Sequence, residues 1–200
     1  MTPDGLKPFV TPRALETAEI AGIVEDYQRG ARNARAAGFD GVELHGANGY
    51  LIDQFLRDRT NRRTDRYGGS AMNRARFLIE AAEAVVGEWD ADRVGVRLSP
   101  TNPFNDMADS SPAATFAAAV GELNRFGLAY LHVVESVAGD PIAAGEMPDI
   151  AFFRKLWRGV LMGNKGYDLA PRQCRAARRT GGSDLVRGAV SRQSRFSVPR

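Results

Sequence analysis

The sequence predicts an α/β fold of parallel strands, and an α/β barrel is the arrangement that we expect. Short apolar segments with strand character alternate along the chain with amphipathic helical segments, which is the pattern of βαβ units. Three of the strand segments, GVELH, VGVRLSP and LHVVE, end in polar or charged residues. In an α/β barrel these ends meet at the face where active sites are built. A doubly wound sheet is the alternative, but no G-x-G-x-x-G turn follows any of the strands.

The elements of the N-terminal half follow from periodicity and from residues typical of helix ends. Residues 19–37 predict an amphipathic helix that ends at Gly38. A short strand follows over Phe39–His45, and a polar, arginine-rich loop over about residues 57–69. Ser70 can cap the next helix. The apolar stripes comprise Ile20, Ile23, Val24, Tyr27, Ala31 and Ala34 in the first helix, and Ala75, Leu78, Ile79, Ala82, Val85 and Val86 in the second.

The same alternation continues in the C-terminal half. Ser111 and Pro112 predict the start of a helix, with the serine as cap and the proline at the first helical position. The expected elements are a strand over Val94–Leu98, a helix from Pro112, a strand over Tyr130–Val134, a helix over Pro148–Trp157 and a strand over Gly159–Met162.

Composition limits the class of protein. A chain of 200 residues, 44% of them hydrophobic, suits one domain with a packed core. Cys174 is the only cysteine, which excludes an internal disulfide and fits a reducing compartment. The N-terminal MTPDGLKPF lacks the form of a signal peptide, and no apolar run reaches the ~18 residues of a membrane span. We therefore expect a soluble, cytoplasmic protein with no membrane partner.

Positive charge is concentrated at the C-terminus. Residues 172–200 contain eight arginines and one acidic residue, Asp184, so this segment carries +7 in a chain whose net charge is +3. We therefore divide the chain into a body, 1–171, and an arginine-rich tail, 172–200, which its composition predicts to be disordered. Nucleic-acid binding by the tail is an alternative. Because the tail has one aromatic residue, Phe196, and no recognisable binding motif, we expect no nucleic-acid partner.

Three polar residues stand at the end of the first predicted strand. His45 ends GVELH, and Asn48 and Tyr50 follow within five residues. Histidine and asparagine can hold a carbonyl or nitro oxygen and stabilise negative charge that develops there. Tyrosine has a phenolic proton and can act as a general acid. The alternative is a satisfied core histidine, a capping asparagine and a packing tyrosine, but the three together at one strand end favour a functional site.

Two further segments can contact a cofactor. Arg97 ends the apolar run VGVRL, and a buried arginine needs a partner, either in a structural ion pair or in a cofactor. The segment MGNKGYD, 162–168, follows the last strand, and the backbone N–H groups of such a turn can bind phosphate together with Lys165. With His45 and His132 as the only histidines, the sequence predicts no metal site.

Taken together, these segments resemble the Old Yellow Enzyme family of flavin-dependent ene-reductases and NADH:flavin oxidoreductases. The resemblance rests on GFDGVELHGANGYLIDQFLRDRTNRRTDRYGGSAMNRARFLIEAAEAV, followed by VGVRLSP, YLHVVE and GNKGYD. Its most specific part is H-x-x-N-x-Y followed by R-T-N-x-R-x-D-x-Y-G-G-S. The resemblance implies a (β/α)8 TIM barrel with FMN at its C-terminal mouth. This chain would supply roughly strands 4 to 7 with their helices.

The resemblance also implies a reaction and a role for each site residue. NAD(P)H reduces FMN, which then gives hydride to the β-carbon of an electron-poor alkene, the small-molecule substrate. By resemblance, His45 and Asn48 bind the electron-withdrawing oxygen of the substrate, and Tyr50 protonates the α-carbon. Arg97 contacts the flavin ring and its ribityl region. The residues expected near the FMN phosphate are Asn164, Lys165 and Gly166.

The resemblance further implies that the first three family strands would lie upstream of Met1, so residues 1–171 correspond to the C-terminal half of the barrel. A truncated, catalytically inactive remnant is therefore the alternative function, and a homo-oligomer that closes the ring is left open. The abrupt change of composition in the tail predicts a frame shift near Arg179–Gly182. With permitted codons, the tail read one nucleotide later resembles the segment around the family's eighth strand.

Overall fold

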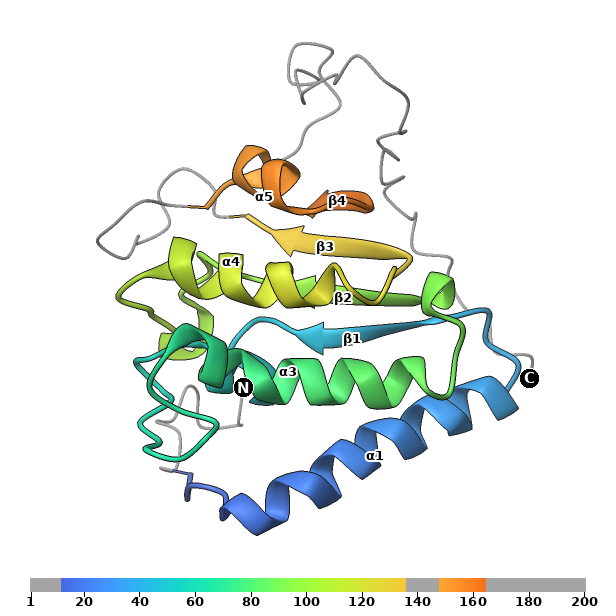
Figure 1. Ribbon diagram of the computed structural model, residues 1–200, viewed down its shortest axis with the longest axis horizontal. Helices are drawn as coiled ribbons and strands as arrows, with labels where there is room; N and C mark the ends of the chain where they lie inside the picture. The colour runs from blue at the N-terminus through green and yellow to red at the C-terminus, as the bar shows by residue number, and fades with distance from the viewer. Residues whose placement is uncertain (1–11, 136–147, 165–200) are drawn as a thin grey trace, which may run out of the picture.

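Four parallel strands form one sheet, and their order in the sheet follows their order in the chain. The computed structural model describes residues 12–135 and 148–164. The strands are β1 (Val42–Gly46), β2 (Val94–Leu98), β3 (Tyr130–Val134) and β4 (Val160–Asn164), and each pairs in parallel with the next (Figure 1). Parallel neighbours require a crossover connection, which helices usually provide. The predicted α/β fold is confirmed.

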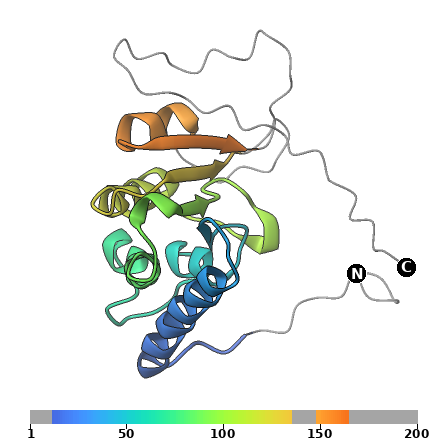
Figure 2. The same cartoon turned by 90° about the vertical axis from the view of Figure 1, so that its right-hand side faces the viewer.

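Helices connect the strands and cover one face of the sheet. The helices are α1 (Thr17–Ala36), α2 (Leu51–Leu56), α3 (Ala71–Val86), α4 (Pro112–Leu123) and α5 (Ile150–Leu156), with 3-10 turns at Ala91–Arg93 and Phe104–Asp106. Helices α3, α4 and α5 lie on the same side of the sheet, and α1 packs against α3 (Figure 2). None of these three helices covers the opposite face. Within the described part of the chain, no helix is both long enough and apolar enough to cross a membrane.

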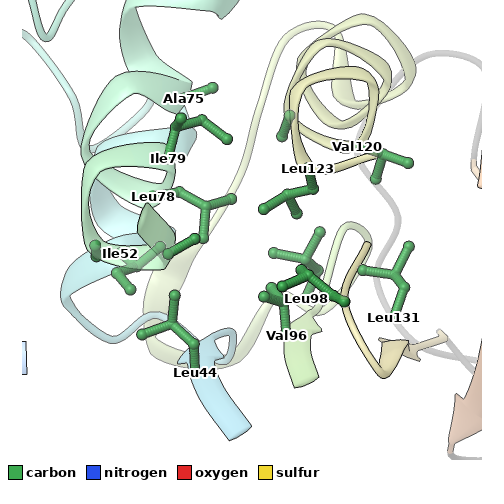
Figure 3. Packing of buried hydrophobic residues seen from close by; sticks show 14 of the residues in the cluster. Leu44, Ile52, Ala75, Leu78, Ile79, Val96, Leu98, Val120, Leu123 and Leu131 are labelled. Atoms are coloured by element: carbon green, nitrogen blue, oxygen red, sulfur yellow. The ribbon is translucent and has the colours of Figure 1, made fainter. Parts of the chain in front are cut away.

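Alternate strand residues build the core between the sheet and the helices. Leu44 of β1, Val96 of β2 and Leu131 of β3 are buried at the same register position. They point toward the helical layer, where Leu78 of α3 and Leu123 of α4 lie opposite (Figure 3). Burying a valine or leucine side chain stabilises the fold by about 1.5–3 kcal/mol. This packing fixes which face of each strand points away from the helices.

The other residues of the strands form a polar layer on the opposite face. His45, Arg97, His132 and Met162 share one register position across β1 to β4. Side chains alternate between the two faces of a strand, so these four lie opposite the face of Leu44 and its neighbours. Three of the four are polar, which gives this face a chemistry quite different from that of the core.

Most of the predicted elements lie where the sequence placed them. The strands over Val94–Leu98 and Tyr130–Val134 have the predicted bounds. The first strand starts at Val42 and not at Phe39, which is 66% exposed. The reason is that Gly38, with φ of 84°, turns the chain after α1, so that extended pairing begins only beyond the turn.

Two differences concern short segments. The last strand continues past the predicted end at Met162, because β3 and β4 remain paired as far as Val134 and Asn164. Helix α2 was absent from the sequence prediction, although Leu51, Ile52, Phe55 and Leu56 provide an apolar face. Its six residues are too few for helical periodicity to be recognised reliably.

The two predicted serine caps have different outcomes. Ser70 caps α3 as predicted, since its hydroxyl accepts a 3.2 Å hydrogen bond from the N–H of Asn73. Ser111 occupies the N-cap position of α4 and Pro112 the first helical position, as predicted, but the Ser111 side chain makes no capping hydrogen bond. Buried Asp109 lies beside the start of this helix and accepts hydrogen bonds from the Ser111 N–H at 2.8 Å and from the Thr115 hydroxyl at 3.1 Å.

Candidate active site

The carboxyl end of β1 carries three of the predicted site residues. His45 lies in the strand, and the chain turns directly after it, with Asn48 and Gly49 in the left-handed region at φ of 58° and 74°. Tyr50 is the N-cap residue of α2. The ring centroids of His45 and Tyr50 are 5.3 Å apart. The structure therefore brings His45, Asn48 and Tyr50 together, and Tyr50 is 56% exposed and accessible to a small molecule.

A buried carboxylate supports this turn. Oδ2 of Asp53 accepts hydrogen bonds from the N–H of Gly49 at 2.9 Å and from Oγ of Ser99 at 3.3 Å. Oγ of Ser99 in turn accepts a 2.6 Å hydrogen bond from the N–H of Asn48. Burial raises the pKa of Asp53, and the charge of Arg57, 2.9 Å away, opposes that rise. Two successive N–H groups of the turn are thus held by groups inside the protein.

The loop that follows β2 holds the turn from another side. Nδ2 of Asn102 donates to Oδ1 of Asn48 at 2.8 Å, and Nδ2 of Asn105 donates to the backbone oxygen of Asn48 at 3.0 Å. A Cβ on Gly49 would lie 2.7 Å from Cβ of Asn105 and 2.9 Å from Cγ of Met107. Glycine is therefore required at position 49 both for its positive φ and for this close contact.

Arg97 lies beside His45 in the sheet, on the polar face. Its Nε is buried and has no hydrogen-bond partner among the described residues, and the same is true of Nε2 of His132 on the next strand. A buried polar atom without a partner costs about 1–3 kcal/mol. An acceptor supplied by a bound molecule would remove that cost for the guanidinium of Arg97.

Glu43 of β1 is the centre of a group of hydrogen-bonded residues on the polar face of the sheet. Nδ1 of His132 lies 2.9 Å from Oε2 of Glu43. Burial acts to raise the pKa of Glu43, but the hydrogen bond from His132 and the charge of Arg97 outweigh it and keep the pKa below its ordinary value. Burial and then Glu43 raise the pKa of Tyr130 to about 12. Burial and then the charge of Arg97 lower the pKa of His45, so the His45 ring is neutral at pH 7.

The predicted phosphate-binding segment lies at the end of the last strand. Asn164 is the final residue of β4 and is exposed at the carboxyl edge of the sheet, the same edge that carries Asn48 and Tyr50. Lys165 and Gly166 lie outside the described residues. Of the three residues expected near a phosphate, the structure therefore places Asn164.

A groove of about 510 Å³ lies between α1 and β1. Its walls are mostly apolar and include Ile23, Tyr27, Ala31, Val42, Leu44 and Leu51. Strand β1 is an edge of the described sheet, and the groove adjoins it. His45 lines this groove, whereas Asn48 and Tyr50 do not. The groove is therefore a neighbour of the candidate site and not its substrate pocket.

Comparison with known proteins identifies the family. The sequence model of the NADH:flavin oxidoreductase / NADH oxidase family matches residues 4–193. The chain belongs to this family. The result confirms the resemblance to Old Yellow Enzyme, and the family description itself names a flavin and NADH.

Individual members of the NADH:flavin oxidoreductase family support this assignment. The putative 12-oxophytodienoate reductase 10 of Oryza sativa subsp. japonica is 49% identical over 169 residues, which are 80% of this chain and 52% of that protein. The structure of the Old Yellow Enzyme homologue from Zymomonas mobilis superposes with a TM-score of 0.77 at 39% identity, over 84% of this chain and 48% of that one. Morphinone reductase gives a TM-score of 0.75 at 46% identity, over 82% and 44%.

This chain thus spans about half the length of the relatives that it matches. Its four parallel strands and their helices correspond to part of the TIM barrel of these structures, as the sequence predicted. The polar layer therefore lies on the side that faces the interior of such a barrel, because the helices of a (β/α)8 barrel form its outer ring.

Sequence reasoning missed the residues that support the candidate site. Asp53 had a local signal, since it stands in the apolar segment LIDQFL four residues before Arg57, the spacing of a helical ion pair. Ser99 and Asn102 had none. They lie 51 and 54 residues from Asn48 in sequence, and only the pairing of β1 with β2 brings them to it.

Proposed function

We propose that this chain carries the substrate site and part of the FMN site of an oxidoreductase that transfers hydride from NAD(P)H through FMN to electron-poor alkenes such as enones. The observation that supports this most is the grouping of His45, Asn48 and Tyr50 at one strand end, next to Arg97, whose Nε has no partner among the described residues. Family membership supports the flavin and the nicotinamide coenzyme.

His45 and Asn48 would bind the electron-withdrawing oxygen of the alkene. A neutral histidine ring has one N–H donor, and the carboxamide of Asn48 has two. When hydride adds to the β-carbon, negative charge moves to this oxygen. Hydrogen-bond donors that are already in place stabilise such charge without reorganising during the reaction. The hydrogen bonds from the N–H of Asn48 to Ser99 and from the N–H of Gly49 to Asp53 keep this turn in place for the role.

Tyr50 would provide the proton that completes the reduction. Its hydroxyl proton passes to the α-carbon while hydride adds to the β-carbon, so the C=C double bond becomes a single bond. The alkene is reduced and NAD(P)H is oxidised. Because Tyr50 is 56% exposed, the phenolate that remains can take a proton back from water.

FMN would lie against the polar face of the sheet. When bound, it accepts hydride from NAD(P)H and passes hydride to the alkene. The donor set fits this group, because the buried Nε of Arg97 has no partner within residues 12–135 and 148–164, and a flavin ring carries acceptor oxygens and nitrogens. Asn164, Lys165 and Gly166 would contact the phosphate, as the resemblance implies.

The test is to measure FMN binding and turnover with recombinant protein. The chain is loaded with FMN, and oxidation of NADH and NADPH is followed anaerobically with 2-cyclohexenone. The same assay is run on a fusion of this chain to the N-terminal half of the related rice reductase. We expect about one FMN bound per fusion protein and loss of enone that depends on the nicotinamide coenzyme. A fusion that binds FMN but never reduces the enone would contradict the proposal.

A truncated, catalytically inactive remnant is the second candidate. Strands β1 and β4 are both edges of the described sheet, whereas a closed barrel core is built from layers of side chains around the whole ring. On this alternative the fusion is active and the isolated chain is not. The comparison of the two proteins therefore distinguishes the role of the site residues from the activity of the isolated chain.

A further inference from the structure

The carboxamide of Asn48 is held by one side chain from a different loop. Its Oδ1 accepts the 2.8 Å hydrogen bond from Nδ2 of Asn102. Its backbone N–H and C=O are bonded to Ser99 and Asn105 respectively, so these two residues hold the main chain and leave the amide group alone. Within the described part of the chain, the Nδ2 group of Asn48 donates no hydrogen bond.

The orientation of both amides follows from one backbone N–H. The N–H of Phe104 lies 3.2 Å from Oδ1 of Asn102, and a backbone N–H can only donate. Asn102 must therefore present its oxygen to Phe104 and its Nδ2 to Asn48. Asn48 must then present its oxygen to Asn102. Its NH2 group is left pointing away from the loop, available to another acceptor.

We propose that Asn102 is a positioning residue that keeps the carboxamide of Asn48 turned so that it presents hydrogen-bond donors to the substrate oxygen. The proposal rests on the proposed function, in which that oxygen is a carbonyl or nitro oxygen. The two ends of an amide have nearly the same shape but opposite polarity. A reversed amide would place the oxygen of Asn48 against the oxygen of the substrate, so the site would repel the ligand that it should bind.

Substitution of Asn102 is a better test than substitution of Asn48. Asn48 has φ of 58°, a conformation that asparagine adopts more readily than most other residues, so replacing it strains the turn. Asn102→Asp keeps the acceptor for the Phe104 N–H but can no longer donate. Asn48 must then rotate its amide by half a turn to donate to the new carboxylate, which reverses the polarity that the site presents.

The orientation can be measured by hydrogen exchange of the side-chain amides, followed by NMR in the chain labelled with 15N-asparagine and without FMN. In the natural sequence we expect the NH2 protons of Asn102 to exchange about tenfold more slowly than those of Asn48, the protection that one hydrogen bond provides. In Asn102→Asp, the NH2 protons of Asn48 should become the protected ones, again by about tenfold.

The matched control is Asn105→Asp. It adds the same charge to the same loop and also removes a hydrogen bond to Asn48, but one made to the backbone oxygen. It should leave the exchange rate of the Asn48 NH2 protons unchanged. An Asn48 amide that is already protected in the natural sequence, or one whose rate Asn102→Asp does not alter, would overturn the proposal whatever the activity.

Ligand binding provides the second readout. In the FMN-loaded fusion, Asn102→Asp should weaken the binding of 2-cyclohexenone roughly tenfold, the loss expected for one hydrogen bond. Asn102→Ala should weaken binding less, since the Asn48 amide can then turn either way. Reversed exchange with unchanged enone affinity would overturn the role of Asn48 as a donor to substrate. It would count against the proposed function and not against the measured orientation.

Discussion

Asp53 and Arg57 form an ion pair inside the protein, with 2.9 Å between Oδ1 of Asp53 and Nε of Arg57 and side-chain exposures of 0% and 3%. The guanidinium also donates to the backbone oxygen of Ser99, and the other carboxylate oxygen accepts the N–H of Gly49. One buried pair therefore connects α2, the end of β2 and the turn that carries the candidate site.

Removing the carboxylate should destabilise the protein strongly. In Asp53→Ala the guanidinium of Arg57 stays buried without its charge partner, and the N–H of Gly49 loses its acceptor. We expect a loss of about 3–5 kcal/mol in the free energy of unfolding, measured by urea denaturation followed by circular dichroism. The control is Asp26→Ala, which breaks an exposed ion pair with Arg29 and should change stability little. Equal effects of the two substitutions would show that burial of the first pair is unimportant.

Replacing the proposed proton donor should separate the two half-reactions. In the FMN-loaded fusion, Tyr50→Phe removes only the hydroxyl. Reduction of the enone should slow by about 100-fold, at the low end of the contribution of a general acid, whereas reduction of FMN by NADH needs no proton from Tyr50 and should keep its rate. Stopped-flow absorbance of the flavin measures both steps. Equal slowing of both steps would remove Tyr50 from the role of proton donor.

A second tyrosine provides the control for Tyr50→Phe. Tyr27 lies on α1, and its ring packs edge-on against Phe77 at 6.0 Å between centroids, far from the turn after β1 in sequence. Tyr27→Phe keeps this packing and should change neither half-reaction. A comparable slowing in Tyr27→Phe would indicate a general effect on the fold.

The sequence predicts the fold well because the fold depends on local patterns. The bounds of β2 and β3 follow from the apolar runs VGVRL and YLHVV, whose burial requires strands at these places. The sequence also indicated His45, Asn48 and Tyr50 as candidate site residues, since all three lie within six consecutive positions. Their proximity in space follows from one strand end and one turn.

The residues that hold the site in place could not be predicted from the sequence, because their contacts depend on which strands become neighbours in the sheet. Asn102 and Ser99 contact Asn48 across the β1–β2 pair, and nothing in their own segment distinguishes them from ordinary loop residues. Ser111 likewise has the residue type and the position of a cap, but its own segment does not show that its side chain makes no capping hydrogen bond.

The hydrogen-bonded group around Glu43 should make the free energy of unfolding depend on pH in the acidic range. The pKa of Glu43 is lower in the folded protein than its ordinary value of 4.5, so the folded state holds the carboxylate more strongly than the unfolded chain does. Its contribution to stability is therefore complete above pH 4.5 and is lost as the pH falls through the folded pKa. Glu43→Gln should be less stable than the natural sequence at pH 6, and the difference should shrink only as the pH falls below 4.5.

Urea denaturation at several pH values between pH 3 and pH 7 measures this difference. Glu83→Gln removes the same charge from an exposed position on α3 and controls for the change in net charge. A difference between the natural sequence and Glu43→Gln that stays constant across the pH range would contradict the role assigned to the hydrogen bond between Glu43 and His132.

A side chain at position 95 should destabilise the protein, because the ring of Tyr130 occupies the space beside Gly95. A Cβ at position 95 would lie 2.2 Å from Cζ of Tyr130, so the ring must move and its hydrogen bond with Glu43 must break. We expect Gly95→Ala to cost about 1–3 kcal/mol in the free energy of unfolding, the usual range for overpacking. The same change in a Tyr130→Ala background should cost clearly less, because the ring is no longer there.

Gly121→Ala is the matched control. No atom lies within 4 Å of its added methyl on α4, and alanine in a helix should raise stability by about 0.5–1 kcal/mol. If Gly95→Ala costs the same with and without the Tyr130 ring, the cause is the backbone of β2, and the contact between the two residues has no part in it.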